Sequence, residues 1–390
     1  MPAPDPTHAP TLAVIGGGQL ARMMAEPAAA MGLPLRLLAE AEGVSAAQVI
    51  PDHQVGDYRD LATLRAVTAG CPVVTFDHEH VPTEHLHALE ADGVAVRPGP
   101  DALVHAQDKG VMRERLAELG VPCPRNAIVA TLADVEAFGF PCVVKTTRGG
   151  YDGKGVWFVR SVEDCADAFA AADATGVRLL AEELVDFRRE LSALVVRSPS
   201  GQAAAYPVVA STQKDGICHE VVAPAPDLDP ALAGQAQEIA LRVAGELDVT
   251  GVLAVELFET NDGRVLVNEL AMRPHNTGHW TQDGAVTSQF ENHLRAVLDL
   301  PLGSPAPRAR WTVMVNILGG PDASVGRLYD GYPHALARDP HLRVHLYGKD
   351  LRPGRKVGHV NAYGDDLDEC LERARHAAAW FRGDLGNESE

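Results

Sequence analysis

The chain has 390 residues, enough for two or three domains, and its 46% hydrophobic and 22% charged residues exclude a largely disordered protein. Its 34 basic against 53 acidic side chains give a formal net charge of −19, so we expect no binding to nucleic acid or to a membrane through a general basic surface. From the sequence we expect neither a signal peptide nor a bilayer-spanning segment, and the six scattered cysteines predict reduced thiols in a cytoplasmic protein.

The first part of the chain alternates strands with helices, which indicates a parallel sheet. A buried strand over Leu12 to Ile15 runs into the glycine turn Gly16 to Gly18 and then into a helix, where Pro27 predicts a kink or a restart. Further apolar strands follow, and Asp60 is placed to cap the helix between two of them. Residues 1–106 are therefore predicted to form an N-terminal doubly wound α/β domain.

The pattern changes after a helix expected at about 107–119. Two strands joined by the glycine-rich loop 148–155 come next, followed by a helix at 161–172 and a strand. Together with its connecting helix, this small α+β unit is predicted to span residues 107–186.

Residues 187–390 are predicted to form the third domain. Its strands are interrupted by a helix at about 229–247, and Asn261-Asp262-Gly263 is a strong turn signal for a hairpin. A terminal segment at about 305–390 follows a proline-rich stretch and ends in an alanine-rich helix near 366–382.

The loop sequence RGGYDGKG (148–155) is the first candidate for a binding site. Its glycines offer several backbone N–H groups that can fold over a polyphosphate, and Lys145 on the preceding strand adds a cation. The spacing is not that of a P-loop. An exposed hairpin with solvated charge is the alternative.

Two glutamates in the predicted hairpin are the second candidate. Glu256 and Glu269 lie among apolar strand residues, where an unpaired carboxylate is costly, and Asn268 adds an amide oxygen. On adjacent antiparallel strands they would face one another and could hold Mg²⁺ that bridges phosphates. Ion pairs with core arginines are the alternative.

Three further segments carry polar groups suited to a site. The loop from Arg273 to Gln282 gathers polar and aromatic side chains, and the run from Lys349 to His359 is the densest positive stretch of an acidic chain. We interpret that run as an anion site for a substrate phosphate, against a solvated basic face. The turn Gly16 to Gly18 favours close approach of a small anion; a dinucleotide fingerprint and a plain strand-to-helix turn are the alternatives.

Taken in chain order, these pieces resemble the ATP-grasp superfamily and, within it, the N5-carboxyaminoimidazole ribonucleotide synthetase family. The similarity runs from about residue 12 to about 380. It is carried by GGGQLARM (16–23), TFDHEHVP (75–82), VVKTTRGGYDGKG (143–155), EELVDFRRE (182–190), NELAMRPHNTGHWTQDGAVTSQFENHLRA (268–296) and RPGRKVGH (352–359). The resemblance implies an ATP-grasp fold behind an N-terminal pre-ATP-grasp domain.

The resemblance also implies a reaction. ATP, with Mg²⁺, would phosphorylate bicarbonate to carboxyphosphate, and the amine of 5-aminoimidazole ribonucleotide would then take the carboxyl group. The products would be N5-carboxyaminoimidazole ribonucleotide, ADP and phosphate, as a step of purine synthesis. A homodimer is implied by the family as well.

The resemblance finally implies a role for individual residues. His105 and Gln213 differ from the family's usual residues at their positions. ATP would contact His105, Lys109, Lys145, Gly150, Tyr151, Asp152, Gly153, Lys154, Gly155, Val156, Glu182, Glu183, Leu184, Val185, Glu190, Gln213, Asn268 and Glu269. Carboxylation would use Tyr151, Asp152, Lys154, Arg273 and His275. The ribonucleotide would contact Gly18, Gln19, Glu79, Lys349, Arg355 and Lys356, and Mg²⁺ would be held by Glu256 and Glu269.

Three other functions compete with this one. Another ATP-grasp carboxylase or ligase would share the nucleotide site but lack the family-specific strings. A non-catalytic nucleotide-binding module would be expected to have lost at least one of Lys109, Lys145, Glu256 and Glu269, and all four are present. A nicotinamide-dependent dehydrogenase has only the first glycine turn in its favour.

Overall fold

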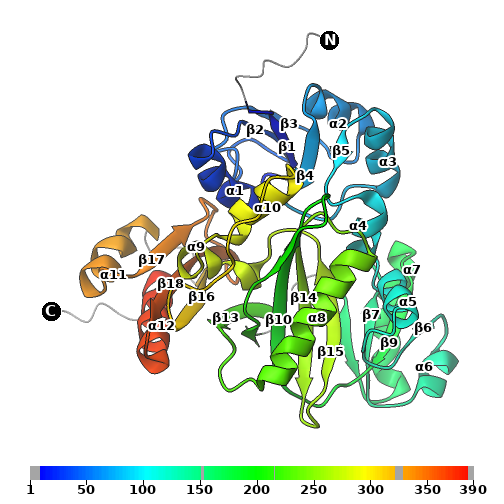
Figure 1. Cartoon of the computed structure of the whole chain (residues 1–390). Helices are drawn as coiled ribbons and strands as arrows, with labels where there is room; N and C mark the ends of the chain where they lie inside the picture. The colour runs from blue at the N-terminus through cyan, green and yellow to red at the C-terminus, as the bar shows by residue number, and fades with distance from the viewer. Residues whose placement is uncertain (1–8, 151–152, 215, 321–327, 385–390) are drawn as a thin grey trace.

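The computed structural model describes residues 9–150, 153–214, 216–320 and 328–384. Strands in these ranges form three sheets, of five, four and nine strands (Figure 1). Across the described ranges, every helix is too short or too polar to cross a membrane.

The N-terminal part is built on a parallel five-stranded sheet. Its elements are β1 (Leu12–Ile15), α1 (Gln19–Ala30), β2 (Leu35–Ala39), β3 (His53–Val55), α2 (Leu61–Thr68), β4 (Val73–Phe76), α3 (Thr83–Ala91), β5 (Ala95–Val96) and α4 (Pro100–Gln107). The order is β3-β2-β1-β4-β5, and every neighbouring pair is parallel. Alternate residues of β1 pack against α1 on one face and against α2 and α3 on the other, which confirms the doubly wound sheet.

Two predictions for this part, the helix cap at Asp60 and the interruption at Pro27, have different outcomes. Asp60 caps α2 as expected, since its carboxylate accepts hydrogen bonds from the Ala62 and Thr63 amides. Pro27, in contrast, neither stops nor restarts α1, which is one continuous helix. The proline removes only one donor, and the final turn closes normally because the Met31 amide donates to the Pro27 carbonyl at 2.9 Å.

The middle of the chain forms the small antiparallel sheet, ordered β6-β9-β7-β8. Its elements are α5 (Lys109–Glu118), β6 (Asn126–Val129), α6 (Leu132–Phe138), β7 (Cys142–Thr146), β8 (Val156–Val159), η1 (Val162–Cys165), α7 (Ala166–Thr175) and β9 (Leu179–Glu183). The helix expected at 107–119 begins at Lys109, because Asp108 breaks the backbone away from α4 and caps α5 with its carboxylate. The helix expected at 161–172 starts as the 3₁₀ turn η1 and continues to Thr175.

The rest of the chain forms one large antiparallel sheet. Its elements are β10 (Phe187–Arg197), β11 (Ala203–Ala205), β12 (Val209–Lys214), β13 (Ile217–Ala223), α8 (Pro230–Glu246), β14 (Gly251–Thr260), β15 (Val265–Ala271), η2 (Asn276–Gly278), α9 (Thr281–Gly284), α10 (Gln289–Val297), β16 (Trp311–Leu318), η3 (Leu328–Gly331), α11 (Tyr332–Arg338), β17 (Arg343–Leu346), β18 (Lys356–Gly364) and α12 (Leu367–Arg382). The order is β15-β14-β10-β12-β13-β16-β18-β17, with β11 paired to β10. The terminal strands therefore continue the sheet that carries the predicted hairpin, β14 and β15, and do not form a separate sheet.

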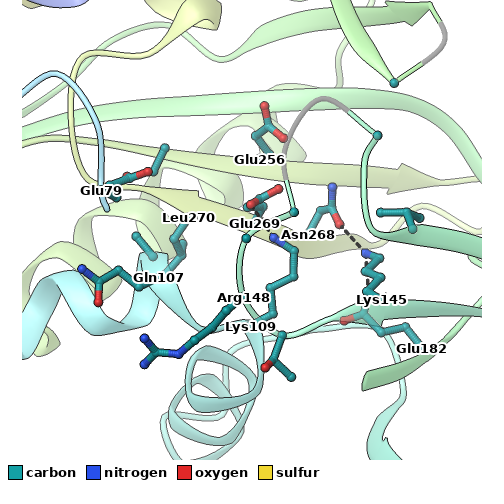
Figure 2. A pocket seen from close by; sticks show the side chains of 18 of the residues that line it. Glu79, Gln107, Lys109, Lys145, Arg148, Glu182, Glu256, Asn268, Glu269 and Leu270 are labelled. Carbon is teal, nitrogen blue, oxygen red and sulfur yellow. Dashed lines mark hydrogen bonds and ion pairs between the residues drawn. The ribbon is translucent and has the colours of Figure 1, made fainter. Parts of the chain in front are cut away.

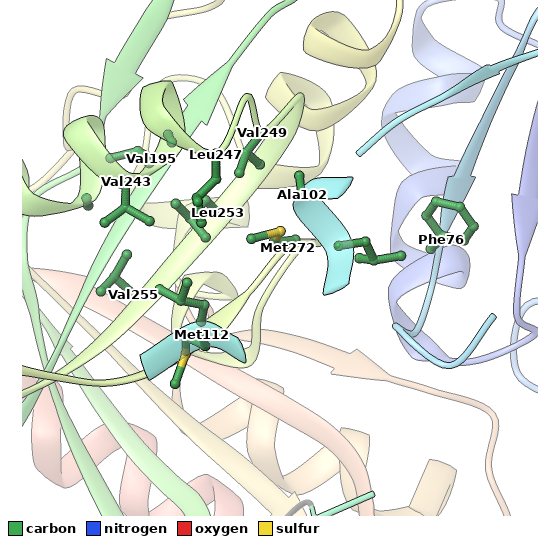
Figure 3. Packing of buried hydrophobic residues seen from close by; sticks show 14 of the residues in the cluster. Phe76, Ala102, Met112, Val195, Val243, Leu247, Val249, Leu253, Val255 and Met272 are labelled. Carbon is green, nitrogen blue, oxygen red and sulfur yellow. The ribbon is translucent and has the colours of Figure 1, made fainter. Parts of the chain in front are cut away.

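A shared hydrophobic core joins the N-terminal sheet to the large sheet. Figure 3 shows Met272, just after β15, between Ala102 of α4 and Leu253 of β14, with Phe76 of β4 at one end of the cluster. All four side chains are buried. The packing fixes the ends of β1 and β4 against the end of β15, where the site residues lie.

Candidate active site

A cavity of about 1090 Å³ lies where the three sheets meet. Its volume is at the upper end of the range for small-molecule sites. Many of the residues expected to form the site line it: Glu79, Lys109, Lys145, Gly150, Gly153, Val156, Glu182, Glu183, Leu184, Val185, Glu190, Gln213, Glu256, Asn268, Glu269, Arg273, His275 and Lys356.

Two lysines from different elements project into the middle of this cavity. Lys109 is the first residue of α5, and its Nζ lies 2.6 Å from Glu269 Oε1 on β15. Lys145 on β7 lies 2.6 Å from Glu182 Oε2 and donates to Asn268 Oδ1 at 3.3 Å (Figure 2). The cations thus stand beside the carboxylates and the amide that the sequence singled out, a mixed arrangement suited to a metal-bound polyphosphate.

Glu182 is ionised although it is almost fully buried. Burial alone would raise the pKa of this carboxyl group, but Arg113 and Lys145 outweigh that effect and hold the pKa at about 2. Arg113 Nε lies 2.5 Å from the other carboxylate oxygen, Oε1. Glu182 therefore acts as a fixed anion that orients Lys145.

Glu256 and Glu269 are directly paired residues of β14 and β15, next to a bulge that follows Glu256. Burial, with added repulsion from Glu269 and Glu190, raises the pKa of Glu256 to about 7. Two carboxylates held this close suit a divalent cation, with Asn268 as a neighbouring amide ligand. Groups of three or more acidic, His or Cys ligands are absent from the described residues, so further ligand oxygens would come from bound phosphate or water.

The alternative of ion pairs with core arginines does not hold for these two residues. Glu269 pairs with Lys109, and Glu256 faces His275, whose Nε2 lies 3.6 Å from Glu256 Oε1. Both partners line the same cavity.

One end of the cavity is apolar. Phe187 and Phe258 stack with ring centroids 4.8 Å apart, and Leu184 and Val185 line the cavity beside them. Aromatic and aliphatic surface beside a strand end with free backbone groups suits a flat heteroaromatic base. The sequence singles out the 182–185 segment but not the two phenylalanines, because aromatic residues in strands are also typical of a hydrophobic core.

Glu190 and Gln213 border the same region. Burial raises the pKa of Glu190 to about 7. Gln213 lines the cavity, and its Nε2 donates to Ser211 Oγ at 3.2 Å. Both side chains are placed to meet polar groups of a ligand whose base lies against the phenylalanines.

The opposite end gathers Arg273, His275 and Lys356. Arg273 Nε lies 3.2 Å from Glu79 Oε2, and the other Glu79 oxygen accepts a hydrogen bond from the Met272 amide at 2.6 Å. Burial, together with the charges of Arg273 and Lys356, places the pKa of His275 well below its ordinary value, so its ring is neutral near pH 7. This end therefore combines two cations with a neutral imidazole, which suits a small oxyanion.

The glycine turn and the basic run near the C-terminus meet each other. Lys349 Nζ donates to Gln19 Oε1, although the two residues are 330 positions apart. The carbonyl of Gly348 accepts from Gln48 Nε2 at 2.7 Å, and the carbonyl of Tyr347 accepts from Ser45 Oγ at 2.6 Å. The sequence reading had placed Gln19 and Lys349 in one substrate site, and the fold makes them neighbours.

One carboxylate accepts from an amide of the glycine turn, and another accepts from an amide in the first turn of α1. Asp77 Oδ1 accepts from the Ala21 amide at 2.8 Å, and Glu40 Oε2 accepts from the Gly17 amide at 2.9 Å. Lys349 adds positive charge beside this turn for an anion.

Several predicted residues lie elsewhere. His105 contacts the Ala102 carbonyl of its own helix through Nδ1 at 3.1 Å and is not part of the cavity wall. His359 does not belong to a basic anion site, because it is fully buried and its Nδ1 lies 2.7 Å from the Tyr347 hydroxyl. The wall, as far as the described residues define it, also omits Gly18, Gln19, Lys154, Gly155, Lys349 and Arg355. Tyr151 and Asp152 lie outside the described residues.

Three family models match the chain and together cover most of it. The ATP-grasp domain matches residues 114–290, the ribonucleotide synthetase preATP-grasp domain residues 10–107, and the phosphoribosylaminoimidazole carboxylase C-terminal domain residues 312–373.

Relatives of known name match over nearly their whole length. The N5-carboxyaminoimidazole ribonucleotide synthase of Mycobacterium tuberculosis is 56% identical over 384 residues, 97% of this chain and 90% of the relative. The enzyme of the same name from Corynebacterium ammoniagenes is 51% identical over 378 residues, 95% of this chain and 91% of the relative.

Solved structures agree with these relatives. The ADP complex of an N5-carboxyaminoimidazole ribonucleotide synthetase superposes with a TM-score of 0.88 at 35% identity, over 97% of this chain and 98% of that one. The Aspergillus clavatus enzyme in complex with ADP and 5-aminoimidazole ribonucleotide gives a TM-score of 0.87 at 31% identity, over 96% and 99%.

Proposed function

The chain belongs to the N5-carboxyaminoimidazole ribonucleotide synthase family of ATP-grasp proteins, and from this we propose how its cavity performs the family's reaction. The enzyme carboxylates 5-aminoimidazole ribonucleotide at the expense of ATP, a step of purine synthesis. The observation that carries the residue assignments is that Lys109, Lys145, Glu256 and Glu269 come together from four elements in one cavity.

ATP lies with its base against Phe187 and Phe258 and with its phosphates between Lys109 and Lys145. The strand end at Glu183 to Val185 meets the base edge with backbone groups, and Glu190 accepts hydrogen bonds from the ribose hydroxyls. Support comes from the apolar wall at this end and from the two lysines held 2.6 Å from Glu269 and Glu182.

Glu256 and Glu269 would hold Mg²⁺, with Asn268 beside them. The raised pKa of Glu256 fits this assignment, since burial and then repulsion from Glu269 and Glu190 disfavour its negative charge, which a bound cation would stabilise. When bound, Mg²⁺ would supply neutralisation of the phosphate charge. The chain's own lysines then orient the terminal phosphate toward the carboxylation end.

Bicarbonate binds at the end formed by Arg273 and His275, beside Lys356. Its oxygen attacks the terminal phosphorus of ATP, ADP leaves, and carboxyphosphate forms. Preorganised cations stabilise this anion, and exclusion of water from this end would limit its hydrolysis. Tyr151, Asp152 and Lys154, from the loop that follows β7, are proposed to complete this end.

The amine of 5-aminoimidazole ribonucleotide then attacks the carboxyl carbon of carboxyphosphate at this end, and phosphate leaves. Glu79, which lies 3.2 Å from Arg273, borders the carboxylation end, while Lys349, Arg355 and Lys356 take the substrate phosphate near Gly18 and Gln19. This places the amine toward the carboxyl donor and the phosphate toward the seam between the first and last parts of the chain.

The proposal includes a cytoplasmic location and a homodimer. All six cysteines are free thiols, which suits a reducing compartment. The dimer is carried over from the family, and light scattering of the purified protein tests it.

The reaction is tested by ADP release with ATP, Mg²⁺ and bicarbonate, measured with and without 5-aminoimidazole ribonucleotide. We expect strong stimulation by the ribonucleotide and formation of its N-carboxylated product. Equal release in both conditions would refute the assignment. Stimulation by a different amine or acid would favour another ATP-grasp ligase.

A further inference from the structure

Arg113 makes three hydrogen bonds to two other elements with one side chain. It lies on α5 with 2% of its side chain exposed. Its Nε donates to Glu182 Oε1 on β9 at 2.5 Å, and its two terminal nitrogens donate to the carbonyls of Val267 at 2.9 Å and Asn268 at 2.7 Å on β15. The guanidinium thus ties the small sheet to the edge strand of the large sheet.

Each of these partners leads to a group that faces the ATP phosphates. The second oxygen of Glu182 pairs with Lys145, which also donates to Asn268. The two carbonyls belong to the residues immediately before Glu269. Lys109, which pairs with Glu269, begins the helix that carries Arg113 itself. Lys109, Lys145, Asn268 and Glu269 are therefore each linked to the guanidinium of Arg113, either through a shared partner or along the same helix or strand.

We propose that Arg113 is a positioning residue for ATP, which sets the spacing between Lys109, Lys145, Asn268 and Glu269 without touching the nucleotide. It is absent from the described wall of the cavity. This inference depends on the proposed function, because it takes ATP as the ligand of these groups.

Arginine is required by the geometry of the three contacts. Its planar fork presents donors in several fixed directions, whereas lysine has one nitrogen at the end of a flexible stem. A lysine at position 113 would keep the positive charge beside Glu182 but could not reach both Glu182 and the two carbonyls. Arg113→Lys therefore separates the geometric role from the charge.

Arg373→Lys is the matched control. Arg373 is also largely buried, its Nε donates to Asp339 Oδ2 at 2.7 Å and a terminal nitrogen donates to the Tyr363 carbonyl at 3.3 Å. It lies on α12, contacts the residue that follows α11, and is outside the described cavity wall. Both substitutions loosen a buried arginine–carboxylate–carbonyl contact, but only one of these contacts leads to the phosphate-facing groups.

The experiment measures the Michaelis constants for ATP and for 5-aminoimidazole ribonucleotide, kcat and the ligand-free melting temperature of the wild type and both variants. For Arg113→Lys we expect the ATP constant to rise about tenfold or more and the ribonucleotide constant to stay within about twofold. For Arg373→Lys we expect both constants to stay within about twofold of the wild type. An Arg113→Lys enzyme with an unchanged ATP constant overturns the inference, and so does a parallel rise in both constants.

Glu182→Gln keeps the test decisive if Arg113→Lys does not fold. The amide preserves the size of the side chain and leaves the two carbonyl contacts of Arg113 in place. We expect it to raise the ATP constant about threefold or more with the ribonucleotide constant unchanged; an unchanged ATP constant in the folded variant contradicts the positioning role. A wild-type enzyme that is not stimulated by the ribonucleotide would instead refute the proposed function.

Discussion

Glu256 and Glu269 are paired residues on neighbouring strands, yet they have different partners. Lys109 lies 2.6 Å from Glu269, whereas Glu256 faces the ring of His275 at 3.6 Å. Glu269 thus has a cation as its direct partner. Glu256 does not, and burial together with repulsion from its acidic neighbours raises its pKa to about 7. The two glutamates should therefore respond differently to substitution.

Glu269→Gln should nearly abolish turnover while the fold stays intact. The amide has the size of the carboxylate, and 40% of the side chain is exposed, so little packing is lost. Losing an anionic oxygen beside the transferred phosphate should remove about 3–4 kcal/mol of transition-state stabilisation, a slowing of about a hundred- to a thousandfold. ADP release and the ligand-free melting temperature check this on one preparation. Glu291→Gln on α10, which breaks only the pair with Arg295, is the control. A Glu269→Gln enzyme that has a lower melting temperature but remains active would contradict the assignment of Glu269 as a metal ligand.

Glu256→Gln should change how stability depends on pH. Because the folded pKa of Glu256, about 7, lies above the ordinary value near 4.5, the folded protein resists ionising this group. The stability associated with the protonated group is fully present below pH 4.5 and is lost as the pH rises to about 7. The glutamine does not ionise, so the melting temperature of the ligand-free variant should gain on the wild type between pH 5 and pH 8. A difference that stays constant across this range would show that Glu256 titrates normally.

Lys349→Ala should weaken binding of the ribonucleotide and leave binding of ATP unchanged. A charge-assisted contact to phosphate contributes about 1.5–3 kcal/mol, or about ten- to a hundredfold in affinity. Steady-state kinetics with each substrate varied in turn provide the measurement. Arg338→Ala, which removes a surface pair with Glu372, should leave both constants unchanged. An unchanged ribonucleotide constant in Lys349→Ala would mean that the basic run is a solvated surface.

Gly18→Ala should destabilise the protein because a methyl group has no room at this position. Its Cβ would lie 2.1 Å from Asp77 Oδ2, and Asp77 would have to release the Ala21 amide. We expect a loss of about 1–3 kcal/mol. Gly234→Ala in α8 meets no atom within 4 Å and should stabilise the helix by about 1 kcal/mol. Denaturant unfolding measures both, and equal effects of the two substitutions would contradict the packing argument.

Local signals in the sequence predicted the local structure well. The alternation of apolar residues and the Asp-Gly turn placed Glu256 and Glu269 on a hairpin, and these two glutamates are indeed paired. Asp60 was identified as a cap from its own short context. Such features depend on residues a few positions apart, so the sequence contains the relevant neighbours.

The features that the sequence did not reveal depend on distant contacts. In the sequence, Arg113 is one of several charged residues of a polar helix, and its role becomes visible only when the fold brings Glu182 and the carbonyls of β15 to it. Asp77 could not be recognised as the acceptor for α1, because its partner Ala21 is 56 positions away. His359 was grouped with a basic run by sequence proximity, whereas strand pairing turns it into the interior.

The contact between Gln19 and Lys349 has a consequence for the order in which the enzyme is made. The ribosome releases Gln19 early and Lys349 only when nearly all of the chain has been synthesised. The cation–carboxylate pairs of the nucleotide site are complete once residue 269 has emerged, some 80 residues before Lys349 (349 − 269 = 80). A nascent chain should therefore gain affinity for ATP before it gains affinity for the ribonucleotide, which stalled chains of increasing length can measure. Premature termination shortly before Lys349 would then produce a nucleotide binder that cannot complete the reaction.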